Sequence, residues 1–190
     1  MSTKTAILTR KKTNIGIKIA LTALFIAAGV LLPQGVHIFG ANMGKTLLPM
    51  HLPVLLSGFV LGPVCGLIVG VVTPMLSALI TGMPNAPTVF FMIAELGVYG
   101  LATGLFFEIF KGKALPSLLC AMVFGRIIYA AALLVCGNLL SMNVPPVMGY
   151  ITGIAAGLPG IIIQLAVIML LVKGGFVFER STGKSEKKTD

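Results

Sequence analysis

The sequence has no tryptophan, and among its 190 residues only five are acidic and three are cysteines. Charged residues make up 10% and hydrophobic residues 57%, whereas a soluble domain has roughly a quarter charged residues. A soluble protein of this length could not bury so much apolar surface, and disordered chains have low hydrophobicity. We therefore expect lipid to surround most of the chain, which excludes an ordinary soluble enzyme or DNA-binding domain.

The motifs of metal, nucleotide and hydrolytic chemistry are also missing. Cys65, Cys120 and Cys136 have no CxxC spacing and lie in apolar runs, where thiols commonly serve as small hydrophobic side chains. His37 and His51 do not have the spacing of a metal site. There is no HExxH, Walker A or GxSxG sequence and no paired-carboxylate arrangement. We therefore expect no bound metal, no cofactor and no enzymatic activity.

Long apolar runs dominate the chain instead. A membrane helix needs about 20 mostly apolar residues, and Gly62-Pro63 is a turn signal that divides one run of double length. The first run is too long for the apolar region of a signal peptide, so we expect it to be retained. The sequence predicts an all-α membrane protein with six transmembrane helices, at residues 15–33, 50–62, 63–82, 88–110, 115–140 and 147–172. The predicted domains are a basic N-terminus (1–14), the six-helix membrane domain (15–172) and a basic tail (173–190).

The basic residues indicate the orientation of these helices. Cytoplasmic loops of membrane proteins are enriched in lysine and arginine. With the N-terminus inside, twelve of the fourteen basic residues face the cytoplasm, while Lys45 is outside and Arg126 is within the membrane. This predicts a multi-pass protein of the cell membrane with both termini cytoplasmic. The net charge of +9 then requires no nucleic-acid partner, although the tail can contact anionic lipid.

Two charged side chains fall inside the predicted spans. Glu95 and Arg126 lie near the middle of the fourth and fifth spans, where a charge costs at least about 2.5–3.5 kcal/mol. These spans are antiparallel neighbours. One interpretation is a structural ion pair that fixes helix packing, and the other is a polar cavity that binds a solute; the two are compatible.

The helical neighbours of these charges favour a cavity. Tyr99 follows Glu95 by four residues and therefore lies on the same helix face. Tyr129 follows Arg126 by three residues, and Asn138 lies about two and a half turns further toward the outside. A stripe of this kind is more typical of a pocket wall than of a packing seam.

Small residues recur at four-residue spacing in two of the predicted helices. Ala23 and Ala27 do so in the first, and Gly66 and Gly70 in the third. Such spacing lets another helix approach closely, so it indicates either internal packing or a docking face for a partner membrane protein.

Gln164 is a further polar residue near the middle of a predicted span, the sixth. For its side chain we expect an interhelical hydrogen bond.

Three stretches carry a family resemblance: LLPMHLPVLLSGFVLGPVCGLIVG within residues 47–84, FMIAELGVYGLATGLFFE (91–108) and GRIIYA (125–130). Together with the six-span plan and the alanine motif, they resemble the substrate-binding S component of energy-coupling factor (ECF) vitamin transporters. The resemblance covers residues 15–172 and favours the pantothenate branch.

The resemblance implies a high-affinity subunit that captures a water-soluble vitamin outside the cell. It would deliver the vitamin by docking on a transmembrane coupling subunit with two ABC ATPase subunits, which use the ATP. The family's docking face in the first helix maps onto Ala20, Ala23 and Ala27. Its substrate pocket in the outer halves of helices four to six, roofed by the first outer loop, maps onto Glu95, Tyr99, Arg126, Tyr129 and Asn138, with His37, Asn42, Lys45 and His51 nearby.

The side chains of the predicted pocket give some indication of which vitamin binds. Arg126 can hold a carboxylate in a low-dielectric pocket, which favours pantothenate, and the absence of tryptophan argues against a large stacked ring such as flavin. If Glu95 neutralises Arg126, the case for a ligand carboxylate at Arg126 weakens.

Two alternative functions remain. One alternative is a membrane assembly protein in which this pair is purely structural and no small molecule binds. The other is an intramembrane enzyme with Glu95 as general base, for which no catalytic partner is evident.

Overall fold

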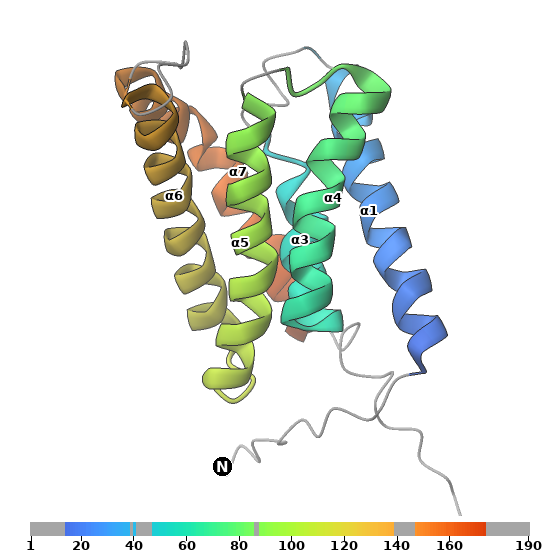
Figure 1. The fold of residues 1–190 in the computed structure, drawn as a ribbon. Helices are drawn as coiled ribbons and strands as arrows, with labels where there is room; N and C mark the ends of the chain where they lie inside the picture. Colours follow the sequence, from blue (N-terminus) through green and yellow to red (C-terminus); the bar gives the residue numbers. More distant parts are fainter. Residues whose placement is uncertain (1–13, 39, 41–46, 86–87, 139–146, 174–190) are drawn as a thin grey trace, which may run out of the picture.

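The computed structural model describes residues 14–38, 40, 47–85, 88–138 and 147–173. These residues form helices and contain no strand, so the predicted all-α architecture is confirmed for them. The helices are α1 (Ile15–His37), α3 (His51–Leu61), α4 (Pro63–Thr81), α5 (Thr88–Ile109), α6 (Ala114–Asn138) and α7 (Val147–Lys173), as Figure 1 shows.

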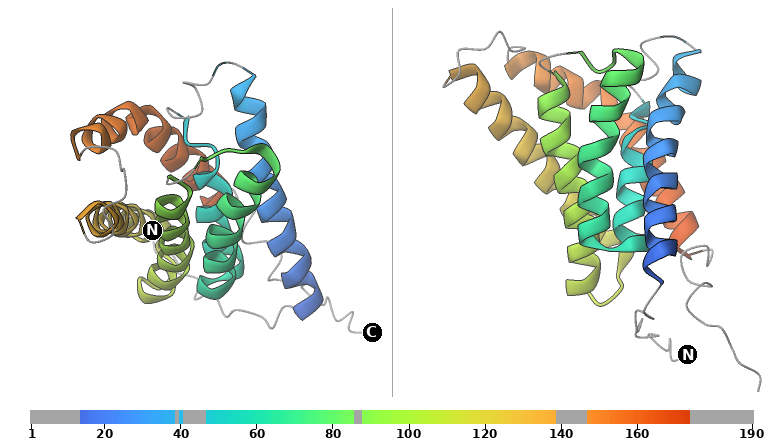
Figure 2. Two further views of the ribbon diagram at one scale, coloured as in Figure 1. Left: turned by 45° about the horizontal axis from the view of Figure 1, so that its top comes forward. Right: turned by 45° about the vertical axis from the view of Figure 1, so that its right-hand side comes forward.

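The helices run alternately up and down (Figure 1). α5 lies between α4 and α6, and α3 packs against α1, α4, α5 and α7. α1 and α6 lie at opposite edges of the bundle in both views of Figure 2. The start of α1, the end of α7 and the turn between α5 and α6 lie at one end of the bundle. Eight of the eleven residues of α3 are buried, so α3 is the central helix.

The predicted spans agree with most of the observed helices. α1 is longer than expected, because it continues through Pro33 to His37. Four helices of the described part are long and apolar enough to cross a membrane: Ile15–Val36, Pro63–Thr81, Thr88–Ile109 and Ala114–Val135. α3 differs, since its 11 residues extend only about 16 Å against a hydrocarbon core of about 30 Å. Six complete crossings therefore stay a prediction.

A short non-helical segment, residues 48–50, leads into α3. Leu48 has a φ of 49°, and α3 begins at His51, whose backbone N–H bonds to the carbonyl of Leu48 at 3.1 Å. The side-chain amide of Gln164, on α7, donates to the same carbonyl at 3.0 Å and lies 3.5 Å from that of Leu47. The expected interhelical hydrogen bond of Gln164 is thus replaced by bonds to the segment that enters α3.

Polar side chains are inside the bundle and large apolar side chains are outside. The buried polar side chains are His51, Ser57, Thr73, Ser77, Glu95, Thr103, Ser117 and Gln164. Leucine, isoleucine, valine, methionine and phenylalanine side chains are exposed on every helix, for example Leu79 at 81% and Leu170 at 71%. This distribution is the one expected where lipid, and not water, contacts the outer surface.

Close backbone contacts join α4 to α5. A Cβ atom at Gly100 would overlap the backbone carbonyl of Gly66, and one at Gly70 would overlap the carbonyl of Leu96. Gly66 and Gly70 are both buried. Their four-residue spacing therefore serves internal packing, which decides between the two interpretations of this motif.

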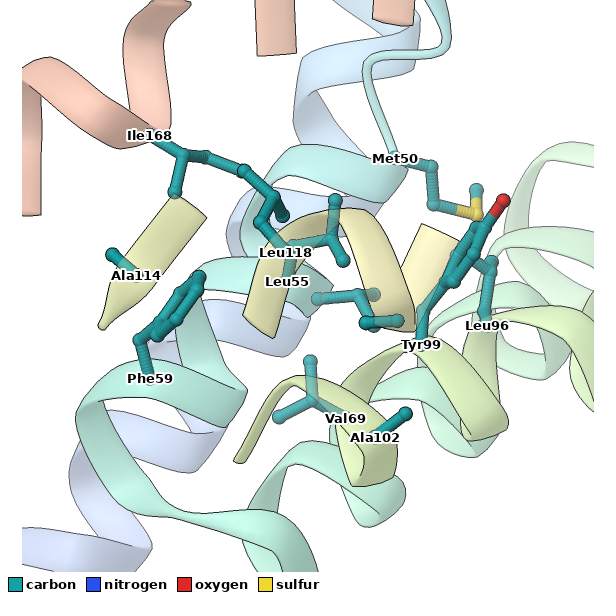
Figure 3. Packing of buried hydrophobic residues seen from close by; sticks show 12 residues of the cluster. Met50, Leu55, Phe59, Val69, Leu96, Tyr99, Ala102, Ala114, Leu118 and Ile168 are labelled. Carbon is teal, nitrogen blue, oxygen red and sulfur yellow. The ribbon is translucent and has the colours of Figure 1, made fainter. Parts of the chain in front are cut away.

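An apolar core extends from these contacts to α6 and α7 (Figure 3). Leu55 and Leu118 are fully buried, and Ile168 of α7 closes the core on one side. Phe59 and Phe107 pack edge to face with ring centroids 5.1 Å apart. Tyr99 and Met50 also belong to this core, and the hydroxyl of Tyr99 joins it to the polar residues through its hydrogen bond to Glu95.

The α4–α5 contact generates a prediction. Gly100→Ala should lower the apparent melting temperature in detergent, because its methyl group meets the backbone of Gly66 and overpacking typically costs about 1–3 kcal/mol. Gly16→Ala is the matched control, since a Cβ atom at Gly16 has nothing within 4 Å. Equal melting temperatures for the two variants would contradict the packing described for α4 and α5.

Candidate functional site

The centre of the site is the carboxylate of Glu95 on α5, which is 2% exposed. Its Oε1 atom accepts a hydrogen bond from the Tyr99 hydroxyl at 3.1 Å and lies 3.1 Å from Nη1 of Arg126 on α6. A buried carboxylate is costly unless it is paired and hydrogen-bonded. Here it has one positive partner and one hydroxyl donor.

Local sequence explains why these groups meet. Glu95 and Tyr99 are one helical turn apart and project from the same face of α5. Arg126 is brought to them by Gly125, because a Cβ atom at this position would overlap the ring of Tyr99. Glycine therefore lets α6 approach the tyrosine closely enough for the next residue to reach Glu95.

His51 approaches the same carboxylate from α3. Its Nε2 atom lies 3.9 Å from Oε2 of Glu95, which is too long for a hydrogen bond. The imidazole packs at a tilt against Tyr99, with ring centroids 5.4 Å apart. The residue is 3% exposed, and neither ring nitrogen has a hydrogen-bond partner among the described residues.

Aromatic rings border the polar cluster one turn away. Tyr129 on α6 packs edge to face against Phe91 on α5, with centroids 5.8 Å apart. Phe91 is 1% exposed and precedes Glu95 by four residues. Phe91 and Gly125 were not among the predicted pocket residues. The signals that could have identified them are their positions, one turn before Glu95 and next to Arg126 in the sequence.

Helix geometry places the cluster at one level of the bundle. Glu95 is about 10 Å along α5 from its first residue, and Arg126 is about 18 Å along α6 from its first residue. His51 is about 15 Å from the last residue of α3, because that helix is short. The groups thus lie well inside the bundle, away from the end that holds the α5–α6 turn (Figure 1).

The remaining predicted pocket residues are not joined to this cluster. Asn42 and Lys45 lie outside the described residues. His37 and Asn138 are the last residues of α1 and α6, and their side chains are outside the described part. Of the predicted pocket residues, the structure brings together Glu95, Tyr99, Arg126 and His51, with Tyr129 one turn away.

The predicted docking residues lie on a different surface. Ala20, Ala23 and Ala27 are exposed along α1. The buried residues Gly29 and Val30 lie on the side of α1 that packs inward, where Gly29 meets Thr73 of α4. The alanines are therefore available to a partner as far as the described part of the chain is concerned.

Within the described part of the chain, no three His, Cys, Asp or Glu side chains are grouped so that they could hold a metal ion.

Residues 17–172 match the family model described as "ECF transporter, substrate-specific component". The chain belongs to this family. Neither the curated proteins nor the solved structures gave a match. The resemblance to the S components is thus confirmed at the level of the class. Substrate-specific components are transporter subunits and not enzymes, and membership implies association with the membrane and ATPase modules of an ECF transporter.

The Glu95–Arg126 pair generates a prediction about stability. Arg126→Gln should destabilise this S component by on the order of 3 kcal/mol, because it leaves a buried carboxylate without its positive partner. Adding Glu95→Gln should recover part of this loss, since no charge is then left unpaired. A cycle of both single variants and the double variant, followed by apparent melting temperatures in detergent, measures this coupling. Strictly additive losses would show that the pair contributes no coupling.

Proposed function

We propose that the chain is the high-affinity substrate-binding subunit of an ECF-type importer, which captures a water-soluble vitamin outside the cell. The observation that carries this proposal is the cluster of Glu95, Tyr99, Arg126 and His51, in which buried ionisable side chains meet inside a helical bundle of this family. Buried ionisable groups in membrane helices commonly mark solute sites.

We place the site toward the outside of the cell membrane. The turn between α5 and α6 carries Lys111 and Lys113, and it lies at the same end of the bundle as the start of α1. Lysine enrichment supports a cytoplasmic location for this end and for both termini. Glu95 supports access from the opposite end, because it is about 10 Å from the first residue of α5 and about 21 Å from the last.

Pantothenate is the vitamin to test first. Its carboxylate is a weaker match to Arg126 than the sequence indicated, because Glu95 already balances the charge of Arg126 at 3.1 Å. Pantothenate also carries two hydroxyl groups and an amide, so it does not depend on a free arginine for recognition.

The ion pair also supports a second candidate, a membrane assembly protein in which the cluster is purely structural. Such a protein would bind no small molecule. The geometry of His51 argues against it, since a structural cluster is not expected to leave both nitrogens of a buried imidazole without a hydrogen bond.

Mass spectrometry of small molecules released from the purified chain tests the binding role. We expect a stoichiometric water-soluble vitamin, and its mass would identify the substrate. A thermal-shift screen across the water-soluble vitamins should find the same compound. An empty preparation together with a negative screen would favour the assembly protein.

The second part of the proposal is that α1 docks on the coupling subunit through Ala20, Ala23 and Ala27. Ala23→Trp should leave vitamin binding intact and abolish uptake in cells that contain the ECF module, because small residues permit close helix contact. Val123→Trp is the matched control, since Val123 is 57% exposed and belongs to α6, which lies at the opposite edge of the bundle from α1 (Figure 2). Normal uptake by the Ala23 variant would contradict the docking face.

A further inference from the structure

Two buried polar side chains of the described part have no hydrogen-bond partner for any of their polar side-chain atoms: His51 and Thr73. Thr73 lies at the contact between α4 and α1, where the methyl group of its side chain meets Gly29. His51 instead lies beside the Glu95–Arg126 pair and the Tyr99 ring. Its unused hydrogen-bonding capacity is therefore inside the candidate site.

The charge of the site limits what it can bind. With the imidazole in its neutral form, the cluster holds one positive and one negative charge, and these lie 3.1 Å apart. A ligand carboxylate next to Arg126 would add a second negative charge near Glu95. Like charges repel strongly in a medium of low dielectric constant.

The chemistry of the imidazole also selects the ligand group. A neutral imidazole has one donor and one acceptor nitrogen. A hydroxyl or amide group both donates and accepts, whereas a carboxylate only accepts and an ammonium only donates. Nε2 of His51 and Oε2 of Glu95 are 3.9 Å apart, a separation that one hydroxyl oxygen can bridge at about 2.8 Å from each atom.

We propose that His51, together with Oε2 of Glu95, binds an uncharged hydroxyl or amide group of the vitamin, and that Arg126 does not bind a ligand carboxylate. This inference rests on the proposed vitamin-binding function. It assigns the substrate class, which is a vitamin with an uncharged hydrogen-bonding group at its buried end. A carboxylate elsewhere on the molecule contributes little to affinity.

Matched pairs of ligands test this assignment by calorimetric titration of the purified chain. The pairs are pantothenate with panthenol, nicotinate with nicotinamide, and biotin with biotinamide, each an acid and its uncharged counterpart. We expect the uncharged member of the pair that binds to have an affinity within about tenfold of that of the acid. His51→Phe keeps a buried ring but removes both nitrogens, and it should weaken binding by at least about tenfold. His51→Gln keeps a donor and an acceptor and should retain more affinity.

Thr73→Val is the matched control. It removes a buried hydroxyl that also has no hydrogen-bond partner in the described part but lies away from the cluster. The affinity of this variant for the ligand should equal that of the wild type. Apparent melting temperatures show whether each variant is folded.

Three results would overturn the assignment and leave the proposed function standing. They are an acid that binds at least about a hundredfold more tightly than its uncharged counterpart, a folded His51→Phe variant with wild-type affinity, and a vitamin held through a permanent positive charge, such as thiamin. If no pair binds and a screen of all water-soluble vitamins is negative, the proposed function itself fails and this inference fails with it.

Discussion

The constraint on which the site depends is the burial of the Glu95 carboxylate in an apolar bundle. A charge of this kind must be compensated locally, and Arg126 and Tyr99 provide the compensation at 3.1 Å each. This requirement fixes the register of α6 against α5, and Gly125 makes the necessary approach sterically possible. The glycine contacts between α4 and α5 hold the other side of the same helix. α5 is thus positioned from both sides, and its polar face is directed at α3 and α6.

The short helix α3 accounts for the second part of the site. Irregular backbone is tolerated at membrane depth only where the protein itself satisfies its polar groups, and Gln164 does so for the carbonyl of Leu48. Because α3 is short and begins at His51, this side chain is at the level of Glu95 and not at the end of the bundle. The side-chain amide of Gln164 on α7 therefore helps to determine where the imidazole of His51 lies.

The sequence was sufficient for part of this arrangement. Apolar runs, turn signals and antiparallel neighbours predicted the helices and the proximity of Glu95 and Arg126, because those features depend on local composition and spacing. The bounds of α3 were predictable too, since the predicted span 50–62 nearly coincides with the observed His51–Leu61. The bonds that hold the preceding residues were not, because they join Leu47 and Leu48 to Gln164, which is more than 100 residues away in the sequence. For the same reason the sequence placed His51 at the outer start of its helix without showing its proximity to Glu95, and it could not decide which small-residue motif packs internally.

α3 also relates the two surfaces of the proposed function to each other. It contacts α1, whose outer face carries the exposed alanines, and it contacts α5 and carries His51. The proposed docking face and the polar cluster share no residue and lie on opposite sides of this central helix. A substitution that acts only on the alanine face therefore leaves the cluster intact. A displacement of α3, in contrast, would have two effects at once. It would change the distance between His51 and Glu95, and it would change the contact between α3 and α1, since both depend on the same eleven residues.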